Sequence, residues 1–227
     1  MAAKRSGAPS KRSLRTRPQP VLEPTGEPPL SRERIVATAV ELLDAQGLDG
    51  LTMRGLAERL GSGVMSLYWH VDNKEDVFDL ALDSVLEYRG PPQMAESQDW
   101  RADIVHMLED WRASMLRHSW SASLLPRRAL GSNILSRLEL LSKTLSKAGV
   151  ADTDLNVAIW SLWNYVMGAT ITRASFDLSD DDMAAAQQRL TGERYTTIER
   201  SRLLLDNDWD GAFRKGLDFL LDGLAPR

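Results

Sequence analysis

The fold of this chain is decided by ten consecutive residues, Leu67-Tyr68-Trp69-His70-Val71-Asp72-Asn73-Lys74-Glu75-Asp76. They place three ring side chains on a helix of barely two turns, and an Asn-Lys-Glu-Asp step then predicts the start of another helix. Because so short a helix is not stable by itself in water, it must pack on neighbouring elements and leave its polar face free for a partner.

The residues before this stretch predict two more helices. Ser31 is a good N-cap for a first helix, which Gly47 ends. Thr52 caps a second, short helix that ends at Gly61, and residues 64–70 form the third. A helix, a tight turn with glycine and another short helix together make the helix-turn-helix pattern.

The residues after it predict helices only. A longer helix runs from Asn73 to Tyr88, and Gly90-Pro91-Pro92 ends it. Further helices are expected over residues 99–118, 132–147, 152–176, 179–190 and 208–224, with no alternating strand pattern. The sequence therefore predicts an all-α fold, in which an N-terminal three-helix helix-turn-helix domain (residues 30–89) is linked by its fourth helix to a second helical domain (residues 90–227).

Residues 1–29 differ in composition from the rest of the chain. They are rich in Pro, Gly and Ser and are expected to be disordered. The first 20 residues carry a charge of +6, whereas the remainder carries −10, within a net charge of −4. The basic residues are Lys4, Arg5, Lys11, Arg12, Arg15 and Arg17. Three interpretations stay open: an arm that contacts nucleic acid, a solvated tail, or an organelle transit peptide.

Composition excludes several classes of protein. The chain has no cysteine, which rules out disulfides and a cysteine nucleophile and fits a cytoplasmic location. No apolar run is long enough for a transmembrane helix. There is no P-loop and no nucleophile elbow, so an enzyme is not expected. His106 and His118 lie about 120° apart around a helix, so we expect neither a metal site nor a cofactor.

Over residues 31–88 the chain resembles the TetR family of transcriptional repressors, and the resemblance continues more weakly to the C-terminus. The residues that carry it are Ile35–Ala39 with Gly47, Thr52–Ala57 with Leu60-Gly61, Leu67–Val71 and Asn73-Lys74. The resemblance implies a homodimer whose two third helices enter successive major grooves of a palindromic operator, with half-sites roughly 34 Å apart. It also implies a second domain that binds a small-molecule effector, of the tetracycline-repressor-like C-terminal class, and dimerises.

The resemblance assigns contacts with double-stranded DNA to Arg54, Met65, Ser66, Tyr68, His70 and Lys74. The planar guanidinium of Arg54 could donate two hydrogen bonds to guanine, or Arg54 could be an ordinary surface arginine. Trp69 is interpreted as a half-buried packing residue in preference to a base reader. The family often has Val where Ser62 stands and a Ser or Thr cap where Gly63 stands. Because few other cations lie in this domain, we hypothesise that residues 4–17 contact phosphate or the minor groove.

The helix expected over residues 152–176 has two apolar stripes, of which the second contains Trp160, Asn164 and Ile171. A helix that is apolar on two faces is buried between two partners, here its own domain and a second subunit. In the last helix, Ala212, Gly216 and Gly223 would allow close approach of another backbone. The alternative is a monomer whose last helices pack on each other.

An effector pocket is predicted from large, adaptable apolar side chains and one amide: Met107, Trp111, Met115, Leu138, Leu141, Trp163, Asn164 and Met167. Asn164 can serve either a structural hydrogen bond or the ligand. We expect a small apolar or polycyclic effector that releases a repressor from DNA. A ligand-independent or activating DNA-binding protein is the alternative.

Overall fold

The computed structural model describes residues 29–90, 97–128, 130–176, 179–190, 194–201 and 208–224, and all regular structure among them is helical. The first domain contains α1 (Arg32–Gly50), α2 (Met53–Arg59), α3 (Val64–Leu67) and α4 (Lys74–Val85). The second contains α5 (Trp100–Arg117), α6 (Ser119–Leu124) with the 3-10 turn η2 (Leu125–Arg127), α7 (Ser132–Lys147), α8 (Asp152–Ser175), α9 (Asp180–Leu190), α10 (Thr196–Ser201) and α11 (Trp209–Leu224). The all-α fold is confirmed. The basic residues of the predicted arm lie outside the described residues.

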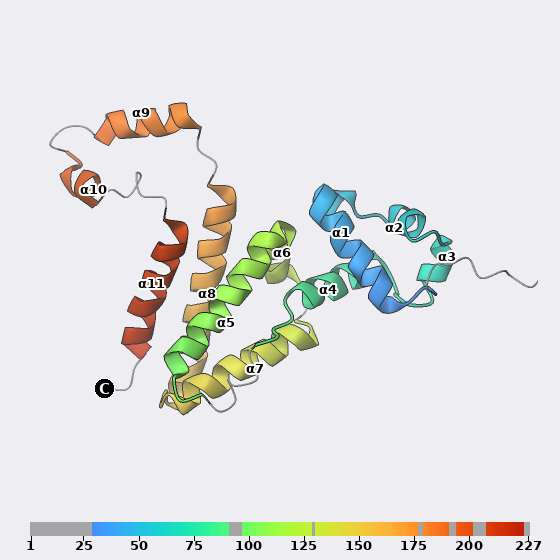
Figure 1. Ribbon diagram of the computed structural model, residues 1–227, viewed down its shortest axis with the longest axis horizontal. Coiled ribbons are helices and arrows are strands. Elements are labelled where there is room, and N and C mark those ends of the chain that lie inside the picture. Colours follow the sequence, from blue (N-terminus) through green and yellow to red (C-terminus); the bar gives the residue numbers. More distant parts are fainter. Residues whose placement is uncertain are drawn as a thin grey trace, which may run out of the picture.

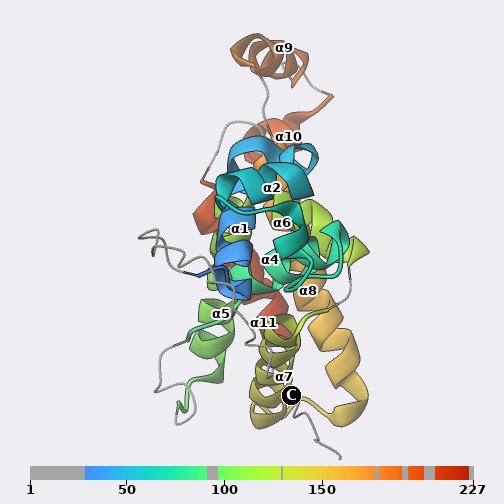
Figure 2. The ribbon, with the colours of Figure 1, turned by 90° about the vertical axis from the view of Figure 1, so that its right-hand side faces the viewer.

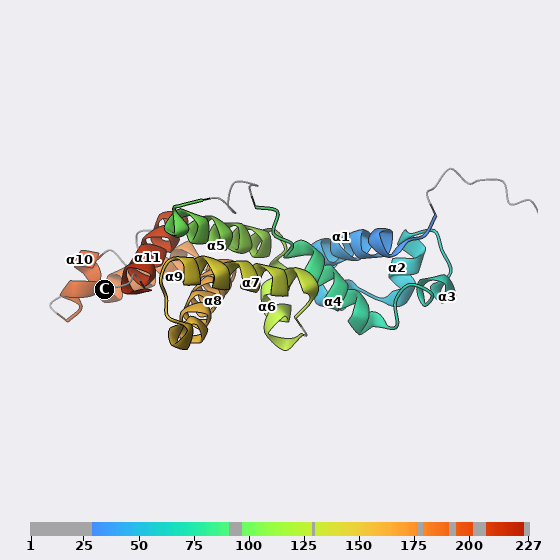
Figure 3. The same cartoon turned by 90° about the horizontal axis from the view of Figure 1, so that it is seen from below.

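The chain is elongated, with α1 to α3 at one end and α5, α7, α8 and α11 packed at the other (Figures 1 and 3). Helix α4 lies between them and packs on α1 on one side and on α7 on the other. A movement of α4 relative to one end of the molecule would therefore also change its packing on the other end.

Local side-chain caps start six of the described helices. In α9 the Asp182 N–H donates to Ser179 Oγ at 3.2 Å, and in α11 the Gly211 N–H donates to Asp208 Oδ1 at 2.9 Å. The other four are α1, α2, α4 and α5, which begin as the sequence predicts. In each, a side-chain oxygen accepts a hydrogen bond from the backbone N–H three residues later: Ser31 from Arg34 (3.3 Å), Thr52 from Gly55 (3.0 Å), Asn73 from Asp76 (2.9 Å) and Asp99 from Ala102 (3.0 Å). These bonds satisfy N–H groups that have no partner within the first turn of a helix.

Two helix ends come earlier than the sequence predicts. Helix α3 ends at Leu67 instead of His70, because the backbone tightens into i→i+3 turns in which His70 N–H donates to Leu67 O at 2.8 Å. Helix α4 ends at Val85 instead of Tyr88. Gly47 breaks α1 as expected, with a φ of 69° that favours glycine.

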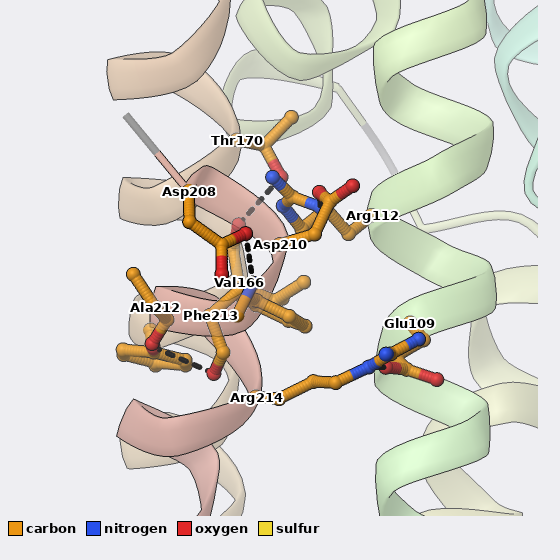
Figure 4. A network of polar contacts seen from close by, with 11 residues as sticks. Glu109, Arg112, Val166, Thr170, Asp208, Asp210, Ala212, Phe213 and Arg214 are labelled. Atoms are coloured by element: carbon orange, nitrogen blue, oxygen red, sulfur yellow. Dashed lines mark hydrogen bonds and ion pairs between the residues drawn. The ribbon is translucent and has the colours of Figure 1, made fainter. Parts of the chain in front are cut away.

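The last helix, α11, is held against α5 and α8 by polar contacts at its surface (Figure 4). Arg112 on α5 donates to Asp210 at 2.6 Å and lies over the Phe213 ring at 4.8 Å. Tyr165 on α8 donates its hydroxyl proton to Phe213 O at 2.9 Å. A Cβ on Gly216 would overlap the Tyr165 hydroxyl. The prediction that Gly216 makes room for another subunit is therefore wrong, since this glycine makes room for a tyrosine of its own chain.

Helices α9 and α10 contact each other and stand apart from the packed helices (Figures 1 and 2). None of their described side chains is buried. They therefore add no described side chain to the core that positions the sites below.

Candidate nucleic-acid interface and ligand cavity

The tip of α3 carries an exposed face anchored by a single buried residue. Leu67 is fully buried and fixes the one-turn helix on the core of α1, α2 and α4. Around it, Met65 is 75% exposed, Tyr68 44% and Trp69 88%. We call Met65, Ser66, Tyr68 and Trp69 the α3 face. It lies at the end of the molecule furthest from α8 and α11 (Figures 1 and 3).

The interpretation of Trp69 as a half-buried packing residue is wrong. Because α3 ends at Leu67, the turn that follows directs the Trp69 ring away from the core. An exposed indole beside a tyrosine and a methionine offers flat and apolar surface that can contact thymine methyl groups or sugars. Trp69 therefore joins the candidate DNA-contacting residues.

The polar candidates lie around this face. Arg54 is exposed on α2, and its Nε donates to Glu58 Oε1 at 2.9 Å. Lys74, at the start of α4, lies with its Nζ 5.1 Å from the centre of the Phe78 ring. His70 is half-buried beside the turn. All three project from helix starts or turns, where both side chains and backbone N–H groups can meet phosphate.

The entry into α3 shows the consequence of the two departures from the family pattern. Gly63 stands at the N-cap and provides no side-chain cap. The Ser62 hydroxyl is buried and has no hydrogen-bond partner in the protein. An apolar side chain would avoid the desolvation cost of that hydroxyl, which explains why Val suits this position.

A cavity of about 340 Å³ lies where α7, α8 and the segment after α6 meet. Its lining is mostly apolar: Leu125, Pro126, Arg128, Leu130, Leu138, Ile159, Trp160 and Trp163. Two larger cavities, of about 440 and 420 Å³, have mainly polar and charged linings. The apolar cavity is the better ligand site, since small-molecule pockets are mostly hydrophobic with few polar groups.

The structure divides the predicted pocket residues into three groups. Leu138 and Trp163 line the cavity. Behind them the closed core contains Met107, Trp111, Met115, Leu141 and Met167. Trp111 still supports the cavity, because its ring packs edge-on against Trp163 with centres 5.0 Å apart. Asn164 is exposed on the outer side of α8 and does not line this cavity.

Sequence reasoning missed the wall made by Leu125, Pro126, Arg128 and Leu130. This segment follows a short helix and contains Pro126, so it has no helical spacing to interpret. A signal was nevertheless present, because a Leu-Leu-Pro-Arg-Arg run in a predicted loop puts apolar side chains where no helix face hides them. Ile159 of the long helix α8 also lines the cavity, beside Trp160 and Trp163.

Arg128 and Arg137, which are far from α4 in sequence, and Asp83 of α4 itself link α4 to the second domain. Arg128 donates through Nε to Asp79 at 2.5 Å and through Nη1 to Glu75. The Asp83 carboxylate accepts from the backbone N–H groups of Asn133 (3.0 Å) and Ile134 (3.2 Å), and so caps the start of α7.

The third of these side chains, Arg137, is buried between α4, α5 and α7. It donates to Leu86 O, to Met107 O and to the Asp110 carboxylate, at 2.8 to 3.3 Å. Its guanidinium lies 4.7 Å from the centre of the Tyr88 ring. Arg137 thus joins the end of α4 to α5 and α7 through one buried cation.

The electrostatics of these links follow from burial and pairing. Burial lowers the pKa of Arg137, and the Asp110 carboxylate opposes that change. The hydrogen bond to Asp79 raises the pKa of Arg128, and Glu75 adds to it. Burial, with the Asp110 charge, raises the pKa of Tyr88 to about 12. Both arginines therefore hold α4 as permanent cations at neutral pH.

Metal-binding clusters and membrane-spanning helices are both absent from the described part of the chain. No group of three or more His, Cys, Asp or Glu side chains is arranged to hold a metal ion there. No helix in the same residues is both long enough and apolar enough to cross a membrane.

A helix-turn-helix domain with an exposed third helix, joined to a helical domain with an apolar cavity, defines a DNA-binding transcriptional regulator. Family models agree: residues 35–81 match the bacterial regulatory proteins of the tetR family, and residues 92–227 match the tetracyclin repressor-like C-terminal domain. The chain belongs to the TetR family, which is a family of regulators and not of enzymes.

Individual relatives cover nearly the whole chain. An HTH-type transcriptional regulator of Saccharopolyspora erythraea is 36% identical over 88% of this chain and 86% of its own length. The TetR family protein ActR of Streptomyces coelicolor, solved in complex with actinorhodin, has a TM-score of 0.72 and 30% identity, over 86% of this chain and 95% of that one. BioQ, solved with its double-stranded DNA operator, has a TM-score of 0.62 and 28% identity, over 87% and 99%.

Proposed function

We propose that this regulator is a homodimeric repressor that a small apolar or polycyclic ligand releases from a palindromic operator. The observation that carries the proposal is the position of α4. Its first turn contains Lys74, which follows the α3 face in the chain. Its Glu75 and Asp79 side chains accept from Arg128 of the cavity wall, and its Asp83 accepts from the start of α7. One rigid helix thus connects the two candidate sites.

In this proposal the α3 face enters the major groove. Met65, Tyr68 and Trp69 would supply apolar and aromatic contacts, and Ser66 a hydrogen bond to a base edge. Arg54 would leave Glu58 for a base or phosphate, while His70 and Lys74 would contact the groove wall. The similarity to BioQ, which was solved on its operator, supports this orientation.

Residues 4–17 would add phosphate or minor-groove contacts from outside the described part of the chain. Up to six cations would steepen the dependence of log affinity on log salt by up to roughly five units. Deleting residues 2–20 and measuring operator binding at several salt concentrations tests this arm. An unchanged slope would show that the arm is a solvated tail.

The chain would form two domains: residues 30–89 would bind DNA, and residues 90–227 would bind the ligand and dimerise. The family models, which end at residue 81 and begin again at residue 92, support this division. As a regulator that acts on DNA, the protein would work in the cytoplasm.

Dimerisation would use the outer faces of α8 and α11, which pack side by side. These faces expose large apolar side chains: Val157, Trp160 and Ile171 on α8, and Phe219 on α11. Asn164 lies on the same side of α8 as Trp160 and would be covered by the partner. Exposed apolar surface of this kind on a soluble chain favours a protein interface. Sedimentation of the full chain tests it, with Trp160→Asp expected to give monomers.

Release of DNA requires the ligand to prefer the conformation that does not fit the operator, because equal affinity for both states shifts nothing. A ligand between α7 and α8 would meet the wall that contains Arg128 and would move α4 through that residue. The neighbour ActR, solved with actinorhodin, supports a polycyclic ligand.

The decisive experiment selects the operator from a random duplex library with the purified protein. The proposal expects a palindrome, and it expects Trp69→Ala to weaken binding about tenfold or more without changing the fold. The matched control is Trp209→Ala, at the start of α11 and far from the α3 face. Compounds that co-purify with the protein are then titrated against the complex. Full DNA binding in the presence of a saturating ligand would contradict the release step.

A further inference from the structure

The apolar cavity contains one charged side chain among its described lining residues, Arg128. Its side chain is 15% exposed, so the guanidinium lies largely out of water. A cation in such a place is stable only when it is paired. Its partners are Glu75 and Asp79, which lie on α4 and are not themselves among the lining residues. Arg128 therefore lines the cavity and holds α4 at the same time.

The three paired side chains, Arg128, Glu75 and Asp79, differ in their exposed fraction. The Glu75 side chain is 63% exposed and that of Asp79 38%. Either carboxylate can return to water more easily than Arg128 can, because its side chain is already the more exposed member of the pair. Arg128 cannot do so without leaving the cavity wall. An anion that enters the cavity therefore competes for Arg128 on favourable terms.

The rest of the lining selects the shape of the molecule that brings the anion. The rings of Trp160 and Trp163 meet at 66° with centres 5.7 Å apart, and Ile159 lies beside them. Aromatic faces and aliphatic side chains favour a flat ring system. A cationic ligand has no counterpart here, since none of the described lining residues is acidic.

We propose that the effector is a planar aromatic acid whose anionic group takes Arg128 from Glu75 and Asp79, and that this exchange detaches α4 from the cavity wall. The proposal rests on the proposed function, and it gives that function a ligand class and a first step. Detachment removes three hydrogen bonds to α4: one to Asp79, one to the Glu75 carboxylate and one of 2.5 Å to the Glu75 carbonyl. Asp83 and Arg137 would still hold the far end of α4. The start of α4, which follows the α3 face in the chain, would therefore be the end that moves.

Two fluorescent probes with the same aromatic frame test the ligand class on the full chain. 8-Anilinonaphthalene-1-sulfonate carries an anion, and N-phenyl-1-naphthylamine does not. A hydrogen-bonded ion pair with Arg128 should make the anionic probe bind about tenfold tighter or more. Leu130→Trp, at an exposed position of the wall, should weaken both probes if they occupy this cavity.

Substitutions test whether Arg128 is the group that binds the negative charge of the anionic probe. Arg128→Gln should abolish the preference for the anionic probe, whereas Arg127→Gln, at the exposed neighbour that does not line the cavity, should keep it. Glu75→Gln removes one of the two charges that compete for Arg128 and removes no buried group, so it should raise the affinity for the anionic probe severalfold and leave that for the neutral probe unchanged. This variant keeps the test valid if Arg128→Gln fails to fold.

The outcomes separate this proposal from the function on which it rests. Equal affinities for the two probes, or a preference that survives in Arg128→Gln, would overturn the aromatic-acid proposal. The neutral probe could then still release the operator, and the repressor would stand. If the anionic probe binds through Arg128 and the operator stays bound, the ligand-release step of the proposed function fails, and with it the detachment of α4.

Discussion

The α3 face and the apolar cavity present their functional side chains in opposite ways. At the α3 face, one buried leucine anchors a single turn, and the residues that would touch DNA stand out in solvent. At the cavity, the functional side chains are part of the wall, and Arg128 also holds the molecule together. Residues of the face can therefore change without loss of the fold, whereas residues of the wall affect stability and function together.

The sharpest test of this difference is made on neighbouring residues of the α3 face. Leu67→Ala removes a fully buried side chain and should lower the free energy of unfolding by about 3 kcal/mol. Trp69→Ala, two residues away and exposed, should change it by no more than about 0.5 kcal/mol. Urea unfolding measures both. A large loss in Trp69→Ala would mean that the indole packs after all.

The second test concerns the cation at the end of α4. Arg137→Met keeps much of the side-chain volume but leaves two backbone carbonyls without their donor, and it should cost about 2 kcal/mol of unfolding free energy. Arg214→Met is the control, because Arg214 is an exposed arginine paired with Glu109 on α5. Equal losses in the two variants would contradict a special role for Arg137.

The third test concerns the cap that α4 supplies to α7. Asp83→Ala should lower the free energy of unfolding by about 1 kcal/mol, since two N–H groups at the start of α7 lose their acceptor. Asp83→Asn keeps an oxygen in place and should recover part of that loss. If Asp83→Asn is as unstable as Asp83→Ala, the negative charge and not the hydrogen bond is what α7 requires.

The smallest effect is a pH dependence. Burial raises the pKa of Tyr88 to about 12, against 10.0 for an exposed tyrosine. The folded chain therefore holds this proton more tightly than the unfolded chain does. The corresponding stability is complete below pH 10 and is lost as the pH rises from about 10 to about 12. Unfolding free energies across this window should fall less steeply in Tyr88→Phe than in the unchanged protein, and identical slopes would contradict the assignment.

The sequence predicted the helices well where a start depends on neighbouring residues. Ser31, Thr52, Asn73 and Asp99 each cap a helix through a bond to the residue three positions later. The start of α7 is different, because Gly131 offers no side-chain cap and the acceptor comes from Asp83, 50 residues earlier. The loop wall of the cavity was missed for a similar reason, since its lining is assembled from three separate parts of the chain.

Two predictions were wrong for the same reason, because each assumed what one face of a helix would contact. Trp69 was expected to pack, and Gly216 was expected to face another subunit. Helical spacing tells which residues share a face, but it does not tell what that face meets. The early end of α3 turned Trp69 outwards, and Tyr165 occupies the space above Gly216.

The sequence by itself determined where most helices begin and end, the helix-turn-helix, and the positions of the α3 face. These features depend on hydrogen bonds and apolar spacings within a few residues. Only the tertiary structure decided which side chains surround the cavity and that Arg128 and Arg137 hold α4. Those contacts join residues about 30 to 50 positions apart. No local pattern encodes such pairs, because their geometry exists only once the helices have packed on one another.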